Sequence, residues 1–406
     1  MRLLFVHERM GALGGAEANV LVTAEALGQR GHVVGLVHGS GPSQGEAGWR
    51  EVFPERFAVD PASGHTDLAR ALAAFEPDLV FLHKFSDPAV LDALLASGRP
   101  VVRMVHDHDL YCMRGYKYNV LTRKICRRAA SAFCVLPCGA SVTRNPGAGF
   151  PLRWVSYRAK RREIEQNRNL HRLIVATDYM RTELLRNGFA PEQIEIHAPV
   201  PRAAPAAGNP SFSDRNLIVY AGQIIRGKGV DVLLESLARV APPFKCVILG
   251  DGNQRADCER LSARLGLHGR VTFAGFVPQA RIADYYRDAS LAVMSSLWPE
   301  PFGATGLEAM RCGLPVVAFD AGGISEWLLD GVNGFLVPWK DRTTFAARVS
   351  TLLGDKPLAR RLGENGRQVA HERFNFVAYI DGLENLFSRT AAAPAARPTE
   401  LCGVTA

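Results

Sequence analysis

Two glutamates placed eight residues apart are the side chains of this chain best suited to chemistry. Glu300 lies in the sequence Pro-Glu-Pro-Phe-Gly (299–303), after the apolar stretch 291–294, and Glu308 follows in the first turn of a helix expected to start near Thr305. This order predicts a βαβ unit, with both acids near the carboxyl ends of parallel strands. Ligands of doubly wound sheets bind at that edge. The two carboxylates are suited to accepting hydrogen bonds from sugar hydroxyls.

The start of the same helix is an expected anion site. The backbone N–H groups of Gly303, Ala304, Thr305 and Gly306 would be free there, and free amides at a helix start favour a phosphate. The alternative is a capping box from Thr305 to Glu308, in which Glu308 only satisfies its own helix. We favour binding because a cap does not need Glu300, whose neighbouring prolines fix its position.

A second loop combines glycines with cations. After the apolar stretch 217–221 come Gly222, Gln223, Arg226 and Lys228, directly before an expected helix. Amides and cations at a helix start make a suitable clamp for a diphosphate, although solvated charges are the plainer alternative.

Two more strands are expected to end at the same edge of the sheet. The stretch 247–249 leads into Gly250, and 271–275 leads towards Val277. Gly250 and the glycine two residues later begin a dinucleotide fingerprint, but Arg255 stands where its third glycine would be. A nicotinamide dehydrogenase therefore fits poorly.

In the N-terminal half, polar side chains again follow an apolar stretch. His106, Asp107, His108 and Asp109 come directly after residues 101–105. We predict that His106 and Asp107 face a cleft and leave the other two unassigned. A solvated loop is the alternative, and a metal site a weaker one, since imidazole and carboxylate both bind metals.

Strand and helix patterns alternate along the chain, which is typical of parallel sheets wrapped by helices. With 406 residues, of which 47% are hydrophobic, the chain can bury two cores. We predict two Rossmann-like α/β domains with doubly wound parallel sheets, at 1–200 and 211–375. A basic, cysteine-containing insertion at about 110–170 interrupts the first. A helix at 376–389 and a disordered tail at 390–406 follow the second.

The strands expected in the first half are 3–6, 33–37, 79–83, 101–105, 173–176 and 194–197. The first leads into a glycine-rich turn ending at Gly14 and Gly15. That turn is either a tight connection or a loop that lets a ligand approach the backbone.

The motif around the two glutamates resembles the donor-site signature of family 4 glycosyltransferases. Its parts are Glu-Pro-Phe-Gly at 300–303, Glu308, Gly-Leu-Pro-Val-Val at 313–317 and Gly-Gly-x-x-Glu at 322–326. The resemblance implies the B-type fold, with two domains facing across a cleft, and a retaining, metal-independent hexosyltransferase that uses a UDP- or GDP-sugar. It extends over nearly the whole chain except 112–170 and the tail.

The resemblance also implies roles for these residues. Glu308 would hold the nucleotide ribose, Glu300 the donor sugar, and amides after Phe302 the sugar and phosphates. Lys228 would bind the diphosphate. The family usually carries a second cation, an arginine, where this chain has Gln223.

Arg226, three residues beyond Gln223, could replace that arginine. The turns at Gly222 and Gly250 would hold base and phosphate, with backbone atoms near Val277 on the base. His106 would reach the transferred sugar. The predicted catalytic residues are His106, Lys228 and Glu300, and the predicted donor-binding residues are Gly15, Asp107, Gly222, Gln223, Arg226, Lys228, Gly250, Val277, Glu300, Phe302, Gly303, Ala304, Thr305 and Glu308.

The net charge of +8 is concentrated in one segment. Fifteen Lys or Arg and four Asp or Glu lie between Arg103 and Arg172, interleaved with aromatic residues such as Trp154. No nucleic-acid motif accompanies them. We expect a carbohydrate or polyprenyl-phosphate-linked acceptor and peripheral contact of residues 103–172 with an anionic membrane. The first residues resemble no signal peptide and no stretch is long enough to span a membrane, so a cytoplasmic protein is expected.

Four cysteines follow the His-Asp sequence. Cys112, Cys126, Cys134 and Cys138 are separated by thirteen, seven and three residues, and only the last spacing is familiar from zinc sites. We favour idle or buried loop thiols over a structural metal site, and expect that no cofactor is required.

We therefore predict a glycosyltransferase of cell-surface polysaccharide or glycolipid synthesis. A same-fold epimerase or phosphorylase, and a non-catalytic nucleotide-sugar-binding or scaffold protein, are the alternatives.

Overall fold

The chain forms two units. The computed structural model describes residues 1–11, 14–39, 46–60, 63–85, 87–119, 121–144, 152–202 and 213–393. The first unit comprises residues 1–115, 128–199 and 377–406, and the second comprises 116–127 and 200–376. Residues 116–127, which we had placed in an insertion of the N-terminal domain, thus group with the second unit.

The first unit is built on a sheet of seven parallel strands. In spatial order they are β11 (Ile194–Ile196), β10 (Arg172–Val175), β5 (Val101–Val105), β4 (Leu79–Leu82), β1 (Arg2–His7), β2 (Val33–Gly39) and β3 (Glu55–Val59). The chain order reverses between β1 and β4, which defines the ligand edge of a doubly wound sheet.

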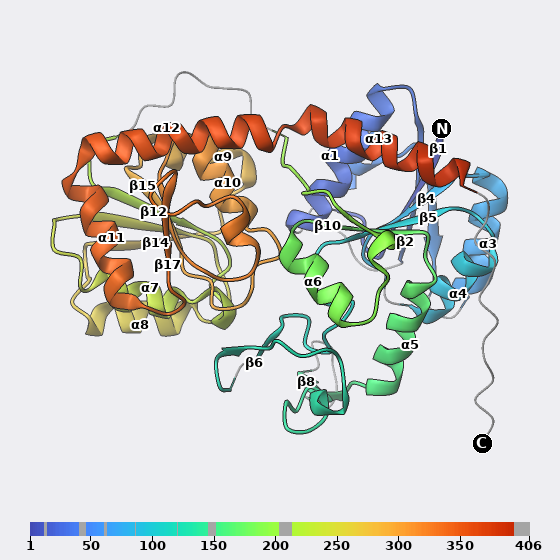
Figure 1. Cartoon of the computed structure of the whole chain (residues 1–406), viewed down its shortest axis with the longest axis horizontal. Helices are drawn as coiled ribbons and strands as arrows, with labels where there is room; N and C mark the ends of the chain where they lie inside the picture. Colours follow the sequence, from blue (N-terminus) through green and yellow to red (C-terminus); the bar gives the residue numbers. More distant parts are fainter. Residues whose placement is uncertain are drawn as a thin grey trace. The chain divides into compact units, whose positions relative to one another are not determined.

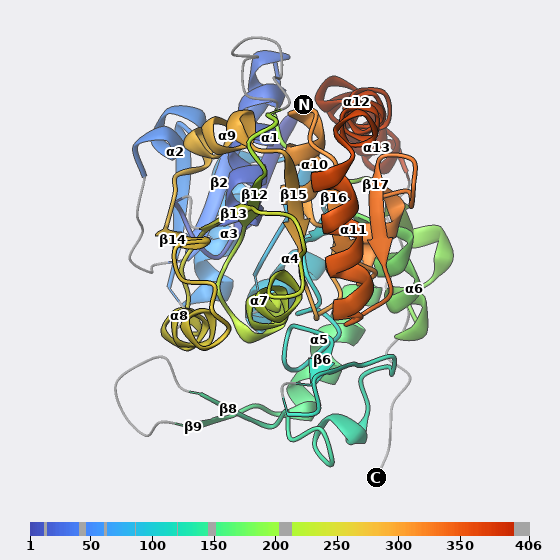
Figure 2. The same ribbon diagram turned by 90° about the vertical axis from the view of Figure 1, so that its left-hand side faces the viewer.

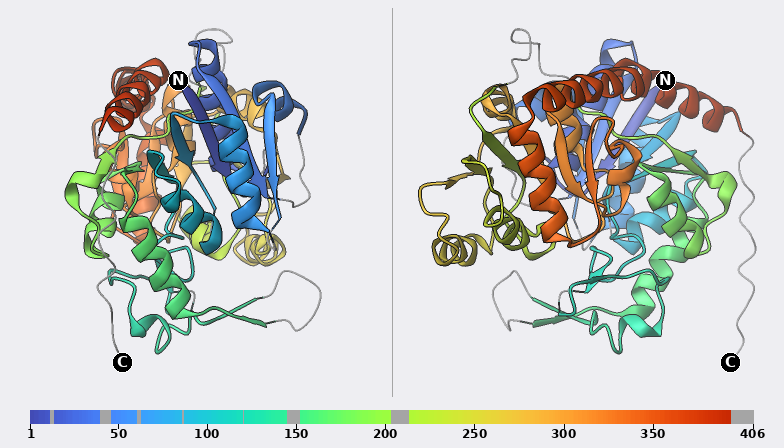
Figure 3. Two further views of the ribbon diagram at one scale, coloured as in Figure 1. Left: turned by 90° about the vertical axis from the view of Figure 1, so that its right-hand side faces the viewer. Right: turned by 60° about the vertical axis from the view of Figure 1, so that its left-hand side comes forward.

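Seven helices accompany this sheet in the described residues: α1 (Gly15–Gln29), α2 (Glu46–Val52), α3 (Gly64–Phe75), α4 (Pro88–Ala96), α5 (Tyr157–Arg168), α6 (Asp178–Arg186) and α13 (Phe376–Ala392). On one face, side chains of β1 and β4 such as Leu4 and Val80 pack with Leu68 of α3 and Leu91 of α4. Figure 3, in its left view, shows the blue helix α3 and the blue-green helix α4 in front of the strands.

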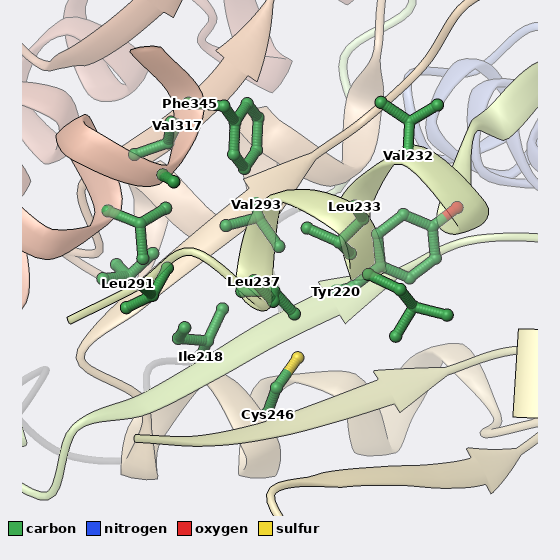
Figure 4. Packing of buried hydrophobic residues seen from close by; sticks show 14 of the residues in the cluster. Ile218, Tyr220, Val232, Leu233, Leu237, Cys246, Leu291, Val293, Val317 and Phe345 are labelled. Atoms are coloured by element: carbon green, nitrogen blue, oxygen red, sulfur yellow. The ribbon is translucent and has the colours of Figure 1, made fainter. Parts of the chain in front are cut away.

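The second unit has a sheet of six parallel strands. In spatial order they are β14 (Val271–Gly275), β13 (Lys245–Leu249), β12 (Leu217–Ala221), β15 (Leu291–Met294), β16 (Val316–Phe319) and β17 (Gly334–Val337). Strands β15 and β16 are buried throughout and read as unbroken apolar runs, as expected for parallel strands covered on both faces. Figure 4 shows part of this core, with Val293 of β15 and Phe345 near Leu233.

The helices of the second unit are α7 (Val230–Leu237), α8 (Arg255–Arg264), α9 (Gln279–Asp288), α10 (Ala304–Arg311), α11 (Arg342–Gly354) and α12 (Lys356–Arg373). Helix α7 packs with α8 and α11, while α10 packs with α9 and α12 (Figures 1 and 2). Two parallel-sheet α/β domains are therefore confirmed.

Several predicted boundaries differ from the structure, most of them by one or two residues. Strand β4 ends at Leu82, so His83 lies beyond it. Helix α13 continues to Ala392, so the first residues of the predicted tail at 390–406 are helical. The rest of that tail, from residue 394, lies outside the described residues.

Candidate active site

Backbone hydrogen bonds fix Glu300 at the ligand edge of the second sheet. Its N–H donates to the carbonyl of Ala321 at 3.0 Å, and the N–H of Gly323 donates to the Glu300 carbonyl at 2.7 Å. Gly322 lies against this segment with φ of 72°, and a Cβ there would come within 2.5 Å of the Glu300 carbonyl oxygen. Only glycine fits this approach. These backbone contacts with the loop after β16 therefore fix the position of the loop after β15.

The carboxylate of Glu300 accepts hydrogen bonds from three side chains on one oxygen. Oε1 lies 2.6 Å from Nζ of Lys228 and 3.0 Å from Nε1 of Trp298, and the hydroxyl of Ser296 also donates to it. Glu300 is only 4% exposed. Burial alone would raise its pKa, but the Lys228 ammonium and the three donors outweigh burial and lower it. Glu300 is therefore an ionised acid in a buried ion pair.

The turn that carries Lys228 is fitted closely to the loop of Glu300. It is the 3-10 helix η3 (Arg226–Lys228), and the hydroxyl of Ser295 donates to the Lys228 carbonyl at 2.9 Å. Gly229 has φ of 65°, and a Cβ there would lie 2.2 Å from the Ser295 carbonyl oxygen. Replacing Gly229 would therefore push the two loops apart.

Of the remaining residues of that loop, Gln223 and Arg226 are exposed. The backbone of Gly222 lies against Gly250, where a Cβ would come within 2.0 Å of the Gly222 carbonyl oxygen. Val277 is half-buried and precedes α9. The structure thus brings the turns after β12 and β13 together, whereas their donor contacts stay predictions.

Helix α10 begins without a side-chain cap. Its N-cap is Gly303, with φ of 85°, and its first residue is Ala304. Thr305 is therefore inside the helix and does not cap it. Our placement of Glu308 in the first turn was wrong, because the helix starts one residue earlier than predicted. The capping-box alternative is excluded by the same observation.

Glu308 keeps one oxygen without a protein partner. Its Oε1 accepts a hydrogen bond from Nε2 of Gln279 at 2.6 Å, while its buried Oε2 has no hydrogen-bond partner among the described residues. Burial raises the pKa of Glu308, and Gln279 and Arg311 offset only part of this effect. A buried acceptor without a partner costs free energy that a ligand hydroxyl could recover.

Phe302 and Gly306 position the start of α10 by packing. Phe302 is buried, and its carbonyl accepts a hydrogen bond from Nε1 of Trp327 at 2.6 Å. A Cβ at Gly306 would lie 2.1 Å from the ring of Trp327, which leaves room for no larger residue. The indole thus sits under the helix start.

In the first unit, three histidines follow three neighbouring strands. His7 ends β1, His83 follows β4 and His106 follows β5. Nδ1 of His83 and Nε2 of His106 are 2.8 Å apart, and the rings of His7 and His83 are 6.2 Å apart. Burial lowers the pKa of His106 to about 3, with a contribution from His7, so its imidazole is neutral at physiological pH.

An ion-pair cluster lies beside these histidines. Nζ of Lys84 is 3.0 Å from Asp107 and 2.7 Å from Asp109. Burial opposes ionisation of Asp107, but Lys84 prevails and lowers its pKa. Burial and Asp107 together raise the pKa of Asp109. The two carboxylates share the Lys84 ammonium, and their pKa values shift in opposite directions.

Sequence analysis missed His7, His83 and Lys84. Their signal was positional, because each stands at or just after the carboxyl end of β4, which neighbours β5, or of β1, which neighbours β4. His108 is buried, and its Nδ1 lies 2.7 Å from the hydroxyl of Tyr111, which gives it a structural role. Gly15 is exposed and a Cβ there would meet nothing within 4 Å, so its ligand contact stays a prediction.

The cysteines Cys112, Cys126, Cys134 and Cys138 are all half-buried, and Cys112, Cys126 and Cys138 are free thiols. Among the described residues, no group of three or more His, Cys, Asp or Glu is placed to hold a metal ion. The hypothesis of a structural metal at these cysteines gains no support from this arrangement.

A cavity of about 260 Å³ lies between α5 and α6. Its lining includes Arg161, Arg168 and Arg186, together with Glu165, which is 3.1 Å from Arg161. Arg168 donates to the carbonyl of Asn187. The cavity is therefore lined mainly by positive charge.

Two family models match consecutive parts of the chain. One described as "Glycosyltransferase Family 4" matches residues 13–199, and one described as "Glycosyl transferases group 1" matches residues 205–369. Together they span most of the sequence.

Curated relatives are similar over a shorter region. An alpha-D-kanosaminyltransferase of Streptomyces kanamyceticus is 32% identical over 179 residues, which is 43% of this chain and 46% of that protein. A D-inositol 3-phosphate glycosyltransferase of Xylanimonas cellulosilytica is 35% identical over 167 residues, 40% of each chain. The matched region thus spans less than half the length of these relatives.

Solved structures are similar over nearly the whole chain. HepE of Anabaena, in complex with UDP and glucose, superimposes with a TM-score of 0.71 at 20% identity and covers 96% of this chain and 100% of its own. The lipopolysaccharide outer core galactosyltransferase WaaB, in its apo form, gives 0.69 at 16% identity, covering 96% and 100%. At these identities the likeness shows the fold, which is the B-type glycosyltransferase fold.

Proposed function

Because this chain belongs to the family 4 glycosyltransferases, we propose that it transfers a sugar from a nucleotide-diphosphate sugar to an acceptor hydroxyl, with retention of configuration. The observation that carries the proposal is the buried ion pair of Glu300 and Lys228 beside the uncapped start of α10. In this proposal, one acid binds the sugar of the donor and a second acid binds its ribose. Cations and backbone amides bind its diphosphate. Glu300, Glu308 and Lys228 supply these groups in one unit.

The reaction breaks the bond between the anomeric carbon and the diphosphate oxygen and forms one to the acceptor oxygen. Lys228, Arg226 and the amides of residues 303–305 would stabilise the leaving diphosphate without reorganising during the reaction. The Gly306 amide, which we had also expected to be free, donates to the Gly303 carbonyl at 3.0 Å. Glu300 would orient the sugar and Glu308 the ribose. With no protein base assigned, we propose that the departing phosphate takes the acceptor proton.

The first unit would contribute His106 and Asp107. The neutral imidazole of His106 is suited to hydrogen bonding with a sugar hydroxyl, and its pairing with His83 fixes its orientation. The ammonium of Lys84 fixes the position of the Asp107 carboxylate through an ion pair. We propose that His106 contacts the transferred sugar.

The acceptor we propose carries a phosphate or another anionic group, as a polyprenyl-phosphate-linked glycan does. The arginine-lined cavity between α5 and α6 favours an anion. UDP- and GDP-sugars are the donors to test first; HepE, which shares the fold, was solved with UDP and glucose.

We further propose that the basic segment meets an anionic membrane. The hairpin of β8 (Val142–Arg144) and β9 (Leu152–Trp154) exposes Trp154 to 70%, and Leu152 beside it is also exposed. Exposed tryptophan in a basic segment suits a membrane interface. In the described part of the chain, no helix is both long and apolar enough to cross a membrane.

The proposal is tested by following UDP-glucose, UDP-N-acetylglucosamine and GDP-mannose by NMR with the wild type, Glu300→Gln and Lys228→Ala. We expect the wild type to release nucleoside diphosphate from one donor, and the two variants to be slower by roughly 100-fold or more. Glu259→Gln, which changes an exposed acid on α8, is the matched control and should equal the wild type.

Other outcomes favour other functions. Interconversion of the donor sugar without release would indicate an epimerase, and consumption of orthophosphate a phosphorylase. Tight donor binding without turnover, even with acceptor glycolipids added, would favour a non-catalytic binding protein.

A further inference from the structure

The hairpin of residues 116–127 folds as part of the second unit, although both of its sequence neighbours belong to the first. It consists of β6 (Tyr118–Asn119) paired antiparallel with β7 (Lys124–Ile125). The side-chain oxygen of Asn119 accepts hydrogen bonds from the N–H groups of Leu121 and Thr122, which shapes the turn.

Three contacts anchor this hairpin to the second unit. The guanidinium of Arg123 makes a bidentate pair with Asp231 of α7, at 2.6 and 3.0 Å. Nζ of Lys340 donates to the Arg123 carbonyl. Tyr118 is 3% exposed and belongs to the hydrophobic core of the unit. Bidentate pairing and core burial make the hairpin a fixed part of this unit.

The same hairpin places an aromatic ring beside the donor-site acid. The ring of Tyr116 stacks on that of Trp298, with centroids 5.1 Å apart and an interplanar angle of 29°. Trp298 donates from Nε1 to Glu300 at 3.0 Å, and Nζ of Lys228 lies 5.0 Å from the Trp298 ring centroid. One indole thus contacts the hairpin and both charges of the ion pair.

The backbone of the Lys228 turn also packs closely on the indole. A Cβ at Gly227 would lie 3.1 Å from the Trp298 ring. Trp298 is therefore confined by the Gly227 backbone and by the Tyr116 ring. Removing the Tyr116 ring would free the indole to turn, and its hydrogen bond to Glu300 would be lost part of the time.

We propose that Tyr116 is a positioning residue for the donor sugar, acting through the hydrogen bond of Trp298 on the Glu300 carboxylate. This inference rests on the proposed function and deepens it, because it makes binding of the sugar, but not of the nucleotide, depend on a hairpin outside the donor motif. The contact that performs this role is the stacking of the Tyr116 ring on Trp298.

The test compares Tyr116→Ala and Tyr116→Phe with the wild type. Dissociation constants are measured by calorimetry for UDP and UDP-glucose, and for GDP and GDP-mannose, and kcat and KM for the donor that turns over. In Tyr116→Ala we expect the affinity for the nucleotide sugar and kcat/KM to fall by roughly three- to tenfold. The affinity for the free nucleotide should stay within about twofold of the wild type, and Tyr116→Phe should match the wild type.

Arg123→Ala tests the anchor of the hairpin separately. It should reproduce the pattern of Tyr116→Ala, whereas Arg260→Ala, which removes an exposed ion pair with Asp257 on α8, should have no effect. Equal losses for nucleotide and nucleotide sugar, or wild-type values in Tyr116→Ala, would overturn the inference.

A spectroscopic measurement keeps this inference separate from the proposed function. The indole N–H resonance of Trp298, assigned with Trp298→Phe, should shift or broaden in Tyr116→Ala and stay in place in Tyr116→Phe. An unchanged resonance in Tyr116→Ala would overturn the positioning role even where wild-type turnover is established. If the wild type binds no nucleotide sugar, the proposed function is wrong, and so is the role of Tyr116 at the donor sugar. The resonance still reports whether Tyr116 orients Trp298.

Discussion

Glu300 and Glu308 stand eight residues apart, and their surroundings shift their pKa values in opposite directions. Lys228 and two further donors lower the pKa of Glu300 although it is buried. Glu308 has a single amide donor, and burial raises its pKa. One acid is thus satisfied by the protein, whereas the other retains an open acceptor for a ligand.

Glu300→Gln should destabilise the protein at neutral pH and less so in acid. The folded-state pKa of Glu300 lies below its ordinary value of 4.5, so ionisation stabilises the fold above that value and the contribution is lost as the pH falls through the folded-state pKa. We expect a loss of about 1–3 kcal/mol at pH 7 for a buried charge-assisted hydrogen bond. Urea unfolding at several pH values measures it. A difference from the wild type that stays constant from pH 7 to below 4 would contradict the ion pair.

His106 should not contribute an inflection to the pH–rate profile between pH 5 and 8. Its pKa of about 3 keeps the imidazole neutral throughout this range, because it is buried and close to other histidines. The measurement is kcat/KM against pH for the wild type and His106→Ala. An inflection near pH 6.5 that is present in the wild type and absent from the variant would show that His106 titrates in the free enzyme.

At the scale of residues, the sequence was enough to identify candidate site residues, but it was not enough to predict the contacts between them. Glu300 and Lys228 were both predicted at the donor site, and the structure joins them in an ion pair. That pair was not foreseen, because 71 residues of chain separate its partners in the sequence. The capping-box alternative from Thr305 to Glu308 failed because the helix begins at Ala304, after the N-cap Gly303, and a local pattern cannot report that choice.

At the scale of elements, the start of α10 depends on glycines, because their lack of a side chain lets the backbone lie close to the Trp327 ring. Gly306 faces Trp327, whose Nε1 also holds the Phe302 carbonyl. These contacts orient the amides that are proposed to meet the donor. The packing of α10 against Trp327 therefore fixes the geometry of the proposed anion site.

Gly306→Ala should lower the thermal midpoint by an amount equivalent to about 1–3 kcal/mol, since an added Cβ would overlap the Trp327 ring. Gly354→Ala is the matched control, because Gly354 ends α11 with nothing within 4 Å of an added Cβ. The control should be neutral or slightly stabilising. Equal midpoints for the two variants in calorimetry would show that the start of α10 is not tightly packed.

The strands could be predicted because buried parallel strands are continuous apolar runs, as 291–294 and 79–82 are. The hairpin of residues 116–127 could not, because its place in the second unit depends on tertiary partners such as Asp231. No periodicity within so short a segment reports which unit it will join.

At the scale of the whole molecule, the end of the chain belongs to the first unit. Tyr379 of α13 lies within hydrogen-bond distance of Asn19 of α1, and Arg30 pairs with Asp381. The ring of Phe387 packs edge-on against Phe81 of β4, with centroids 4.9 Å apart. Helix α13 therefore packs against α1 and β4 of the first unit.

Phe387→Ala should destabilise the first unit by about 3–5 kcal/mol, because it removes a fully buried ring. Hydrogen exchange monitored by mass spectrometry should be faster than in the wild type in β1 and β4, and unchanged in β15 and β16. Asn385→Ala, at an exposed position of the same helix, is the control. Equal changes in both sheets would indicate that the two units do not unfold separately.

The donor site is tested most directly by thermal-shift measurements with UDP, GDP and ADP and their common sugar conjugates, on the wild type and Glu308→Gln. Without nucleotide the variant should be as stable as the wild type or more so at pH 7, because the raised pKa makes ionisation of Glu308 unfavourable to the fold as pH rises above 4.5. A nucleotide at about 100 times its dissociation constant should add about 2.7 kcal/mol to the stability of the wild type. We predict that one nucleotide gives this shift and that Glu308→Gln loses most of it. If no nucleotide stabilises the wild type, or if the variant responds equally, Glu308 does not bind a nucleotide and the proposed donor site is wrong.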